Sequence, residues 1–312
     1  MQLTVPPPEY AKLGLRAIKG VAIADGEFHP LERQLIDGAQ RHVLHTDFDL
    51  DALTPIADAE LEQVPPGEFR ERIFNAALIV ALIDGEASAA EVAELDRIAT
   101  VFGLESRALE DVRRLTHGCM NIFRLDILRR GFSGQRIQNY LKIRGLSGAA
   151  TILRAVAHRE DAALAAKYYA LAELPANTLG RQYHDFIRAN DFDFPGEKNG
   201  APEPIVFHDC LHVLGGYGTS AIEEGEILAF QAGMITKDPV YTFMFALAQF
   251  HLGIAVSPVT DPLKMQLDPE SLTRGMVRGS KVNRDLCVDW QPWDDFERDV
   301  DELRAQFEIA PR

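Results

Sequence analysis

Apolar residues recur at helical spacing along most of the chain, whereas alternating strand patterns are few. The stretch 160–174 is rich in good helix formers, and the stretch 293–309 has the pattern of an amphipathic helix. The stretch 239–256 is apolar nearly all round, so we expect a buried helix or the wall of a pocket there. Together these patterns predict an all-α fold.

Two segments in the first third of the chain resemble each other. Residues 22–36 and 81–98 each place an apolar helix before Asp-Gly-Glu, with a further glutamate seven residues after the aspartate. We expect the glycine to end the first helix, because glycine adopts a left-handed backbone at little cost. Residues 88–91 predict a capping box, and the sequence His29-Pro30 predicts another helix start. We therefore predict two helix–turn–helix units in a domain that spans residues 8–118.

The acidic residues of this repeat are Asp25 and Glu32 in the first unit and Asp84 and Glu91 in the second. Two interpretations remain open. The carboxylates cap the helices and stabilise their dipoles, or they bind a cation. The D-x-D-x-D-G spacing of an EF-hand is absent, which disfavours that kind of calcium site.

Basic residues gather in the middle of a chain that is acidic overall. The net charge of −15 disfavours a nucleic-acid partner, yet residues 127–159 contain seven Lys or Arg and no Asp or Glu. We take residues 119–159 as a basic connector and predict that its amphipathic part presents Ile137, Tyr140 and Leu141. Its cations either dock on anionic lipid headgroups or pair with the acidic N-terminal domain.

The remaining residues, 160–312, contain a histidine pair that suits a metal ion. His208 and His212 lie at i and i+4, which places both imidazoles on one face of a helix. Asp209 is a third ligand or orients one, and a glycine-rich turn can fold Glu224 back onto the histidines. On a helix Glu226 lies about 200° from Glu224, so only one of the two can face the ion. Mixed nitrogen and oxygen ligands suit a divalent metal, of which we favour zinc over iron or manganese.

These residues carry a resemblance to a known family. The segment HDCLHVLGGYGTSAIEE fits HDxxH-x11-E, the signature of the Coq4 family of ubiquinone biosynthesis proteins, and the similarity covers about residues 165–312. The resemblance implies an all-helical domain in which His208, Asp209, His212 and Glu224 are the metal ligands. The family usually has Gly-Glu at the end of the motif, and here that pair is Gly225-Glu226, which makes Glu226 the alternative ligand.

The same resemblance implies a hydrophobic ligand, namely a prenylated quinone precursor or another isoprenoid lipid. Phe243, Ala246, Leu247 and Phe250 would then line the tail, and the metal would act at the ring carboxyl position as a Lewis acid or by activating water or oxygen. Other quinone-biosynthesis proteins and an anionic membrane surface are the further partners that we expect. Two alternatives remain, which are a non-enzymatic lipid-binding or scaffolding protein with a structural metal site, and a metal-dependent hydrolase of the HD type.

The N-terminal third resembles a second family, the TerB-like helical domains of tellurite resistance, through its acidic turns at Asp25-Gly26 and Asp84-Gly85. Such domains are mostly adaptor or metal-associated modules. We expect no signal peptide, because the first residues lack a basic and an apolar region, and no apolar run reaches the roughly 18 residues of a membrane span. Three widely separated cysteines suggest a reducing compartment. We therefore predict a cytoplasmic protein, peripheral to the inner membrane.

Overall fold

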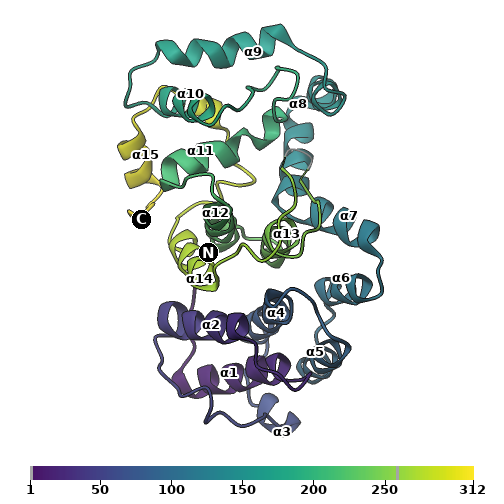
Figure 1. Ribbon diagram of the computed structural model, residues 1–312. Coiled ribbons are helices and arrows are strands. Elements are labelled where there is room, and N and C mark those ends of the chain that lie inside the picture. Colours follow the sequence, from purple (N-terminus) through teal and green to yellow (C-terminus); the bar gives the residue numbers. More distant parts are fainter. Residues whose placement is uncertain (1–2, 258–259) are drawn as a thin grey trace.

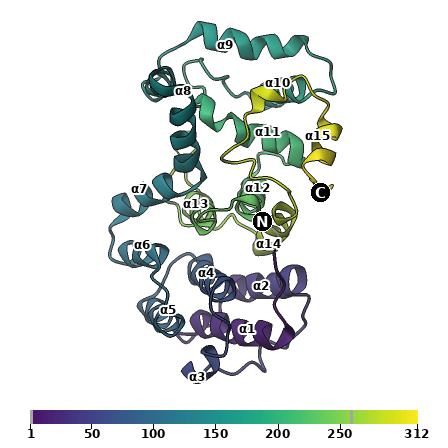
Figure 2. The ribbon, with the colours of Figure 1, turned by 180° about the vertical axis from the view of Figure 1, so that it is seen from behind.

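A computed structural model describes residues 3–257 and 260–312 of the chain. Over these residues it contains fifteen α-helices and no strand, which confirms the predicted all-α fold. The helices stack in three tiers, and a run of helices climbs along one side from the lowest tier to the highest (Figure 1). Figure 2 shows the same stack from behind.

The lowest tier holds the N-terminal helices. They are α1 (Pro8–Ala22), α2 (Pro30–Ala39), the π-helical turn η1 (Gln40–Leu44), α3 (Asp58–Leu61), α4 (Glu68–Ile83) and α5 (Ala89–Phe102). The pairs α1–α2 and α4–α5 are the two predicted helix–turn–helix units. Gly26 and Gly85 in their turns have φ of 98° and 113°, which only glycine adopts at low cost. His29 caps α2 and Ser88 caps α5, as the sequence predicts.

The climbing run corresponds to the predicted basic connector and the helix before it. It consists of α6 (Arg107–Thr116), α7 (Met120–Arg130) and α8 (Phe132–Val156). The backbone of α8 departs from helical geometry at Gly145, which kinks the helix. Arg129 and Arg130 pair with Asp126, and Arg154 pairs with Asp161, so these ion pairs do not join the connector to the predicted N-terminal domain.

One of the three residues predicted for the docking face of this connector does not lie at the surface, and the other two, Ile137 and Leu141, are half-buried. Tyr140 is buried, and its hydroxyl donates a hydrogen bond to Oε2 of Glu203 at 2.5 Å. Arg136 is buried as well, and its guanidinium donates to the carbonyl oxygens of Pro204 and Val288. Tyr140 and Arg136 therefore face the protein interior, where they contact segments that are distant in sequence. The exposed large apolar side chains of α8 lie further along, at Ile143, Leu146, Leu153 and Val156.

The other two tiers come from residues 160–312. The highest tier contains α9 (Ala162–Tyr169), η2 (Ala170–Glu173), α10 (Leu179–Ala189), η3 (Glu203–Ile205), α11 (Val206–Gly215), η4 (Pro292–Asp294) and α15 (Val300–Gln306). The middle tier contains α12 (Ala221–Met234), α13 (Val240–Phe250) and α14 (Pro269–Ser280). Glycines bring α12 and α14 unusually close, since a Cβ atom on Gly279 would lie 1.9 Å from the carbonyl oxygen of Phe230.

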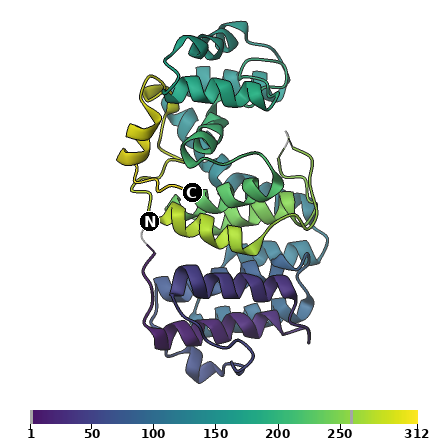
Figure 3. The same cartoon turned by 60° about the vertical axis from the view of Figure 1, so that its left-hand side comes forward.

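The middle tier also packs on the lowest one. α14 lies against α2, and α13 lies against α4 and α7, as the view in Figure 3 shows for α14 and α2. Buried apolar residues form one cluster that runs through both tiers, so the N-terminal helices share their core with the C-terminal ones. None of the described helices is both long and apolar enough to cross a membrane.

Candidate metal centre

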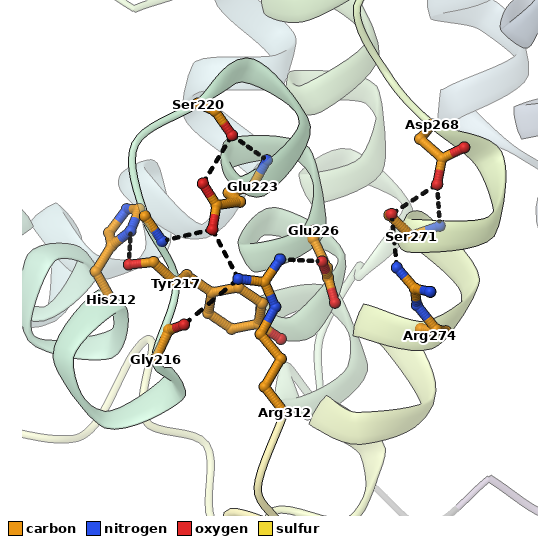
Figure 4. Close-up of polar contacts among 11 residues, drawn as sticks. His212, Gly216, Tyr217, Ser220, Glu223, Glu226, Asp268, Ser271, Arg274 and Arg312 are labelled. Carbon is orange, nitrogen blue, oxygen red and sulfur yellow. Dashed lines mark hydrogen bonds and ion pairs between the residues drawn. The ribbon is translucent and has the colours of Figure 1, made fainter.

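A short turn between α11 and α12 positions the predicted metal ligands. α11 ends at Gly216, whose φ of 69° lets the chain reverse, and the backbone N–H of Tyr217 donates to the carbonyl oxygen of His212 at 3.0 Å. Ser220 then caps α12 by accepting a hydrogen bond from the backbone N–H of Glu223. The turn therefore brings the first turn of α12, which carries Glu224, beside the histidine face of α11. Figure 4 shows this turn, with Ser220 and Glu223 near His212.

Three of the predicted ligands converge on one point. The Nε2 atoms of His208 and His212 are 3.2 Å apart. Oε2 of Glu224 lies 3.4 Å from Nε2 of His208, and its Oε1 lies 3.5 Å from Nε2 of His212. Ligands about 2.0–2.1 Å from a tetrahedral zinc ion are about 3.3–3.4 Å from one another. The three side chains therefore have the spacing of one face of such a site, and this group can hold a metal ion.

Hydrogen bonds on the far side of each imidazole orient the two histidines. Nδ1 of His212 lies 3.4 Å from the carbonyl oxygen of Tyr217, so it can donate and leave Nε2 free for an ion. Nδ1 of His208 lies 2.6 Å from the side-chain nitrogen of Gln231, while the amide oxygen of Gln231 is buried without a partner. Turning that amide over would give the oxygen its partner and place the proton of His208 on Nδ1. The orphaned oxygen thus fits a His208 that binds metal through Nε2.

The charges of the three groups also suit a cation. Burial, together with the neighbouring His208, lowers the pKa of His212 to about 4. Burial opposes protonation of His208, but the hydrogen bond and the charge of Glu224 outweigh it and raise the pKa of His208. Burial favours the protonated form of Glu224, but His208 outweighs it and lowers the pKa of Glu224. At neutral pH the group therefore offers a neutral His212 and an ionised carboxylate.

The other two candidates lie apart from this group. Among the described residues the converging set contains His208, His212 and Glu224 and does not include Asp209. Burial raises the pKa of the Asp209 carboxyl to about 6. Glu226, the alternative ligand, is buried and pairs with Arg312, whose Nη2 lies 2.9 Å from its Oε2. The geometry therefore brings Glu224, and not Glu226, to the histidines.

Two residues of the site were missed in the sequence. Arg312 contacts both acidic neighbours of Glu224, since its Nη1 also lies 2.7 Å from Oε1 of Glu223 (Figure 4). No local pattern signals this contact, because Arg312 is 86 residues from Glu226. Gln231 could have been found, since it follows Glu224 by seven residues and so lies on the same face of α12.

The predicted lipid wall is divided between two environments. Phe243 lines an apolar cavity that is described below, whereas Ala246, Leu247 and Phe250 are buried in the core and do not line it. His251 belongs to the core as well, since its Nε2 lies 2.7 Å from the carbonyl oxygen of Ile83.

The repeat brings its four acidic residues together in the lowest tier. Oε2 of Glu32 accepts the backbone N–H of His29 at 2.9 Å, and Oε2 of Glu91 accepts that of Ser88 at 2.8 Å, which confirms the capping role. Burial raises the pKa of Glu32 to about 8 and that of Glu91 to about 7. The negative charges of Glu91, Asp84 and Asp25 raise the pKa of Glu32 further. Over the described residues they do not form a group with metal-ligand spacing, and cation binding stays a prediction.

Comparison with known proteins adds no family to these observations. No family model matches the chain, and a search of curated proteins finds no match.

Proposed function

We propose that the chain is a metal-dependent enzyme that acts on a prenylated aromatic precursor in ubiquinone biosynthesis, with zinc as the favoured metal. One observation carries the metal: the ligand atoms of His208, His212 and Glu224 lie 3.2 to 3.5 Å from one another. The substrate class rests on the resemblance of residues 165–312 to the Coq4 family. A second candidate, a lipid-binding scaffold with a structural metal, shares the same ligands and differs in having no turnover.

The number of ligands favours an enzyme over a structural site. Structural zinc sites have four protein ligands, whereas catalytic sites have three and leave one position for water or substrate. His208 and Glu224 keep about a sixth to a fifth of their side-chain surface exposed, at 17% and 19%, while His212 keeps 1%. An ion held by these residues could be reached from the side of His208 and Glu224.

Each residue then has a separate part in the chemistry. A bound metal ion would supply Lewis-acid polarisation of an oxygen, or an activated water. The three ligands hold it, and the contacts of Gln231 and the Tyr217 carbonyl fix the direction of the imidazoles. Asp209 lies next to His208 in the sequence, and burial raises the pKa of its carboxyl to about 6.

Metal analysis of two matched variants tests the site. Glu224→Gln should lower the bound metal strongly, because it removes the ligand charge that lies beside both histidines. Glu226→Gln, two residues further along α12, should leave the metal content near that of the wild type, because this carboxylate pairs with Arg312. Loss of metal from the Glu226 variant alone would overturn the assignment.

A genetic test separates the enzyme from the scaffold. In cells that lack their own Coq4-type protein, the wild-type chain should restore ubiquinone, and a folded His212→Ala variant should not. Restoration by the metal-free variant would support the scaffold and remove the metal from the mechanism. Failure of the wild-type chain itself would contradict the pathway, although the metal site would stand.

We further propose that the far part of α8 docks on an anionic membrane surface. Ile143, Leu146, Leu153 and Val156 are 59%, 91%, 68% and 67% exposed, and the connector around them carries cations without acids between residues 127 and 159. Apolar side chains among cations bind anionic lipid through burial and charge together. Co-sedimentation with vesicles should therefore require anionic lipid and weaken with salt, and Leu146→Glu should reduce it. Binding that ignores both lipid charge and salt would contradict the proposal.

A further inference from the structure

An apolar cavity of about 250 Å³ lies where the lowest tier meets the middle one. α1, α2 and α4 form one side of it, with Ile18, Ile73 and Ile79 among the lining residues, and α12, α13 and α14 form the other, with Ala232, Phe243 and Met276. Dry apolar cavities of about 150 Å³ already admit benzene. The space between the two halves of the chain is therefore large enough for an organic ligand.

The lining indicates what kind of ligand fits. Its polar members are neutral apart from Arg72, which pairs with Glu68 and donates to the carbonyl oxygen of Thr4. Among the described residues that line the cavity, none has a carboxylate. An uncharged, apolar ligand suits such a lining.

The cavity is separate from the metal centre. Gln231 and Ala232 are consecutive residues of α12, yet the side chain of Gln231 contacts His208 while Ala232 lines the cavity. Consecutive helix residues point about 100° apart, so the two sites use different faces of α12. A ligand in the cavity therefore does not need the metal.

We propose that this cavity binds the single hydrocarbon chain of a lipid, and that the N-terminal helices are one wall of that binding site. The site goes beyond the proposed function, because a chain of any suitable lipid would fill it. Apolar surface on both sides favours such an occupant over water, since burying apolar surface is favourable and the lining offers water few polar partners. Fatty acyl and isoprenoid chains share this chemistry, and the experiment distinguishes them.

A fluorescent polyene fatty acid, cis-parinaric acid, serves as the probe. The wild-type chain should bind it saturably, and Ala76→Trp, which fills the cavity from α4, should weaken binding at least tenfold. Ala90→Trp is the matched control, because Ala90 is exposed on α5 and does not line the cavity. Protein stripped of metal by a chelator should bind the probe as before. Competition by palmitic acid against geranylgeraniol then shows whether the acyl or the isoprenoid chain is preferred.

A second measurement needs no variant and so does not depend on how Ala76→Trp folds. A fatty acid and an isoprenoid alcohol that carry a photoreactive diazirine should label peptides of α4 and also peptides of α13 or α14. Labelling confined to one half of the chain, or to the exposed part of α8, would overturn the proposal. Equal probe binding by the Ala76→Trp and Ala90→Trp proteins would overturn it as well.

Discussion

Glu32 should make the lowest tier less stable as the pH rises, and Glu32→Gln should remove this effect. The pKa of Glu32 rises from an ordinary 4.5 to about 8, chiefly through burial. The folded state then holds a proton that the unfolded chain releases between these values. Protonated Glu32 therefore contributes its full stabilisation to the folded state below pH ~4.5. This stabilisation is lost progressively as the pH rises to about 8.

The size of the effect follows from the same two values. At about 1.4 kcal/mol for each pH unit, the loss reaches about 3 kcal/mol at pH 7 and at most about 5 kcal/mol above pH 8. Glutamine keeps the carbonyl oxygen that accepts the His29 N–H and carries no charge at any of these pH values. The variant should thus equal the wild type near pH 4 and exceed it increasingly toward pH 8.

Hydrogen exchange of the α2 amides, corrected for the intrinsic pH dependence of exchange, is the suitable assay. Both tryptophans, Trp290 and Trp293, lie outside the N-terminal helices, so their fluorescence would not report on them. Glu91→Gln should also gain stability over the wild type as the pH rises, but only up to about pH 7, because the pKa of Glu91 is about 7. A stability difference between Glu32→Gln and wild type that is constant from pH 4 to pH 8 would refute the reasoning.

Three further outcomes are expected. Calcium at pH 8 should protect the α2 amides of the wild-type chain but not those of Glu32→Gln if the acidic residues bind a cation, and equal protection of both would leave capping as their role. Gln231→Leu should weaken metal binding about 10- to 100-fold by freeing the His208 imidazole, as equilibrium competition with a chelator would measure. Arg312→Ala should weaken it about tenfold or less, because Arg312 touches the neighbours of Glu224 and not the ligand itself, and Arg312→Lys should restore part of the loss.

Local chemistry made the helices and the ligand group predictable. Ser88 caps α5 where the sequence suggested it, because a side-chain oxygen at such a position satisfies backbone N–H groups of the first turn. The spacing of His208 and His212 sets their common face by helix geometry alone. Glu224 reaches them because glycines and a capping serine close the turn within a few residues. All of these contacts lie within a short span of sequence.

Contacts between distant segments were not predictable. The amphipathic pattern around Tyr140 predicts an exposed helix face. Tyr140 is instead buried, and its hydroxyl donates a hydrogen bond to Glu203, 63 residues away. The sequence offers Glu226 as an alternative metal ligand, but this carboxylate pairs with Arg312, which is 86 residues away. Periodicity shows that a helix has an apolar or a charged side, but it does not show which neighbour covers that side.

α12 is the element in which these local and distant effects meet. Its first turn carries Glu224, its last turn carries Gln231 beside His208, and the next two residues, Ala232 and Gly233, line the apolar cavity. Close packing fixes its position, since a Cβ atom on Gly233 would lie 2.2 Å from the carbonyl oxygen of Met276. A larger side chain there would displace α12 from α14 and move the ligand and the cavity wall together. The close contact at the glycines thus fixes the position of α12 against α14, while different faces of α12 carry the candidate ligand group and line the cavity.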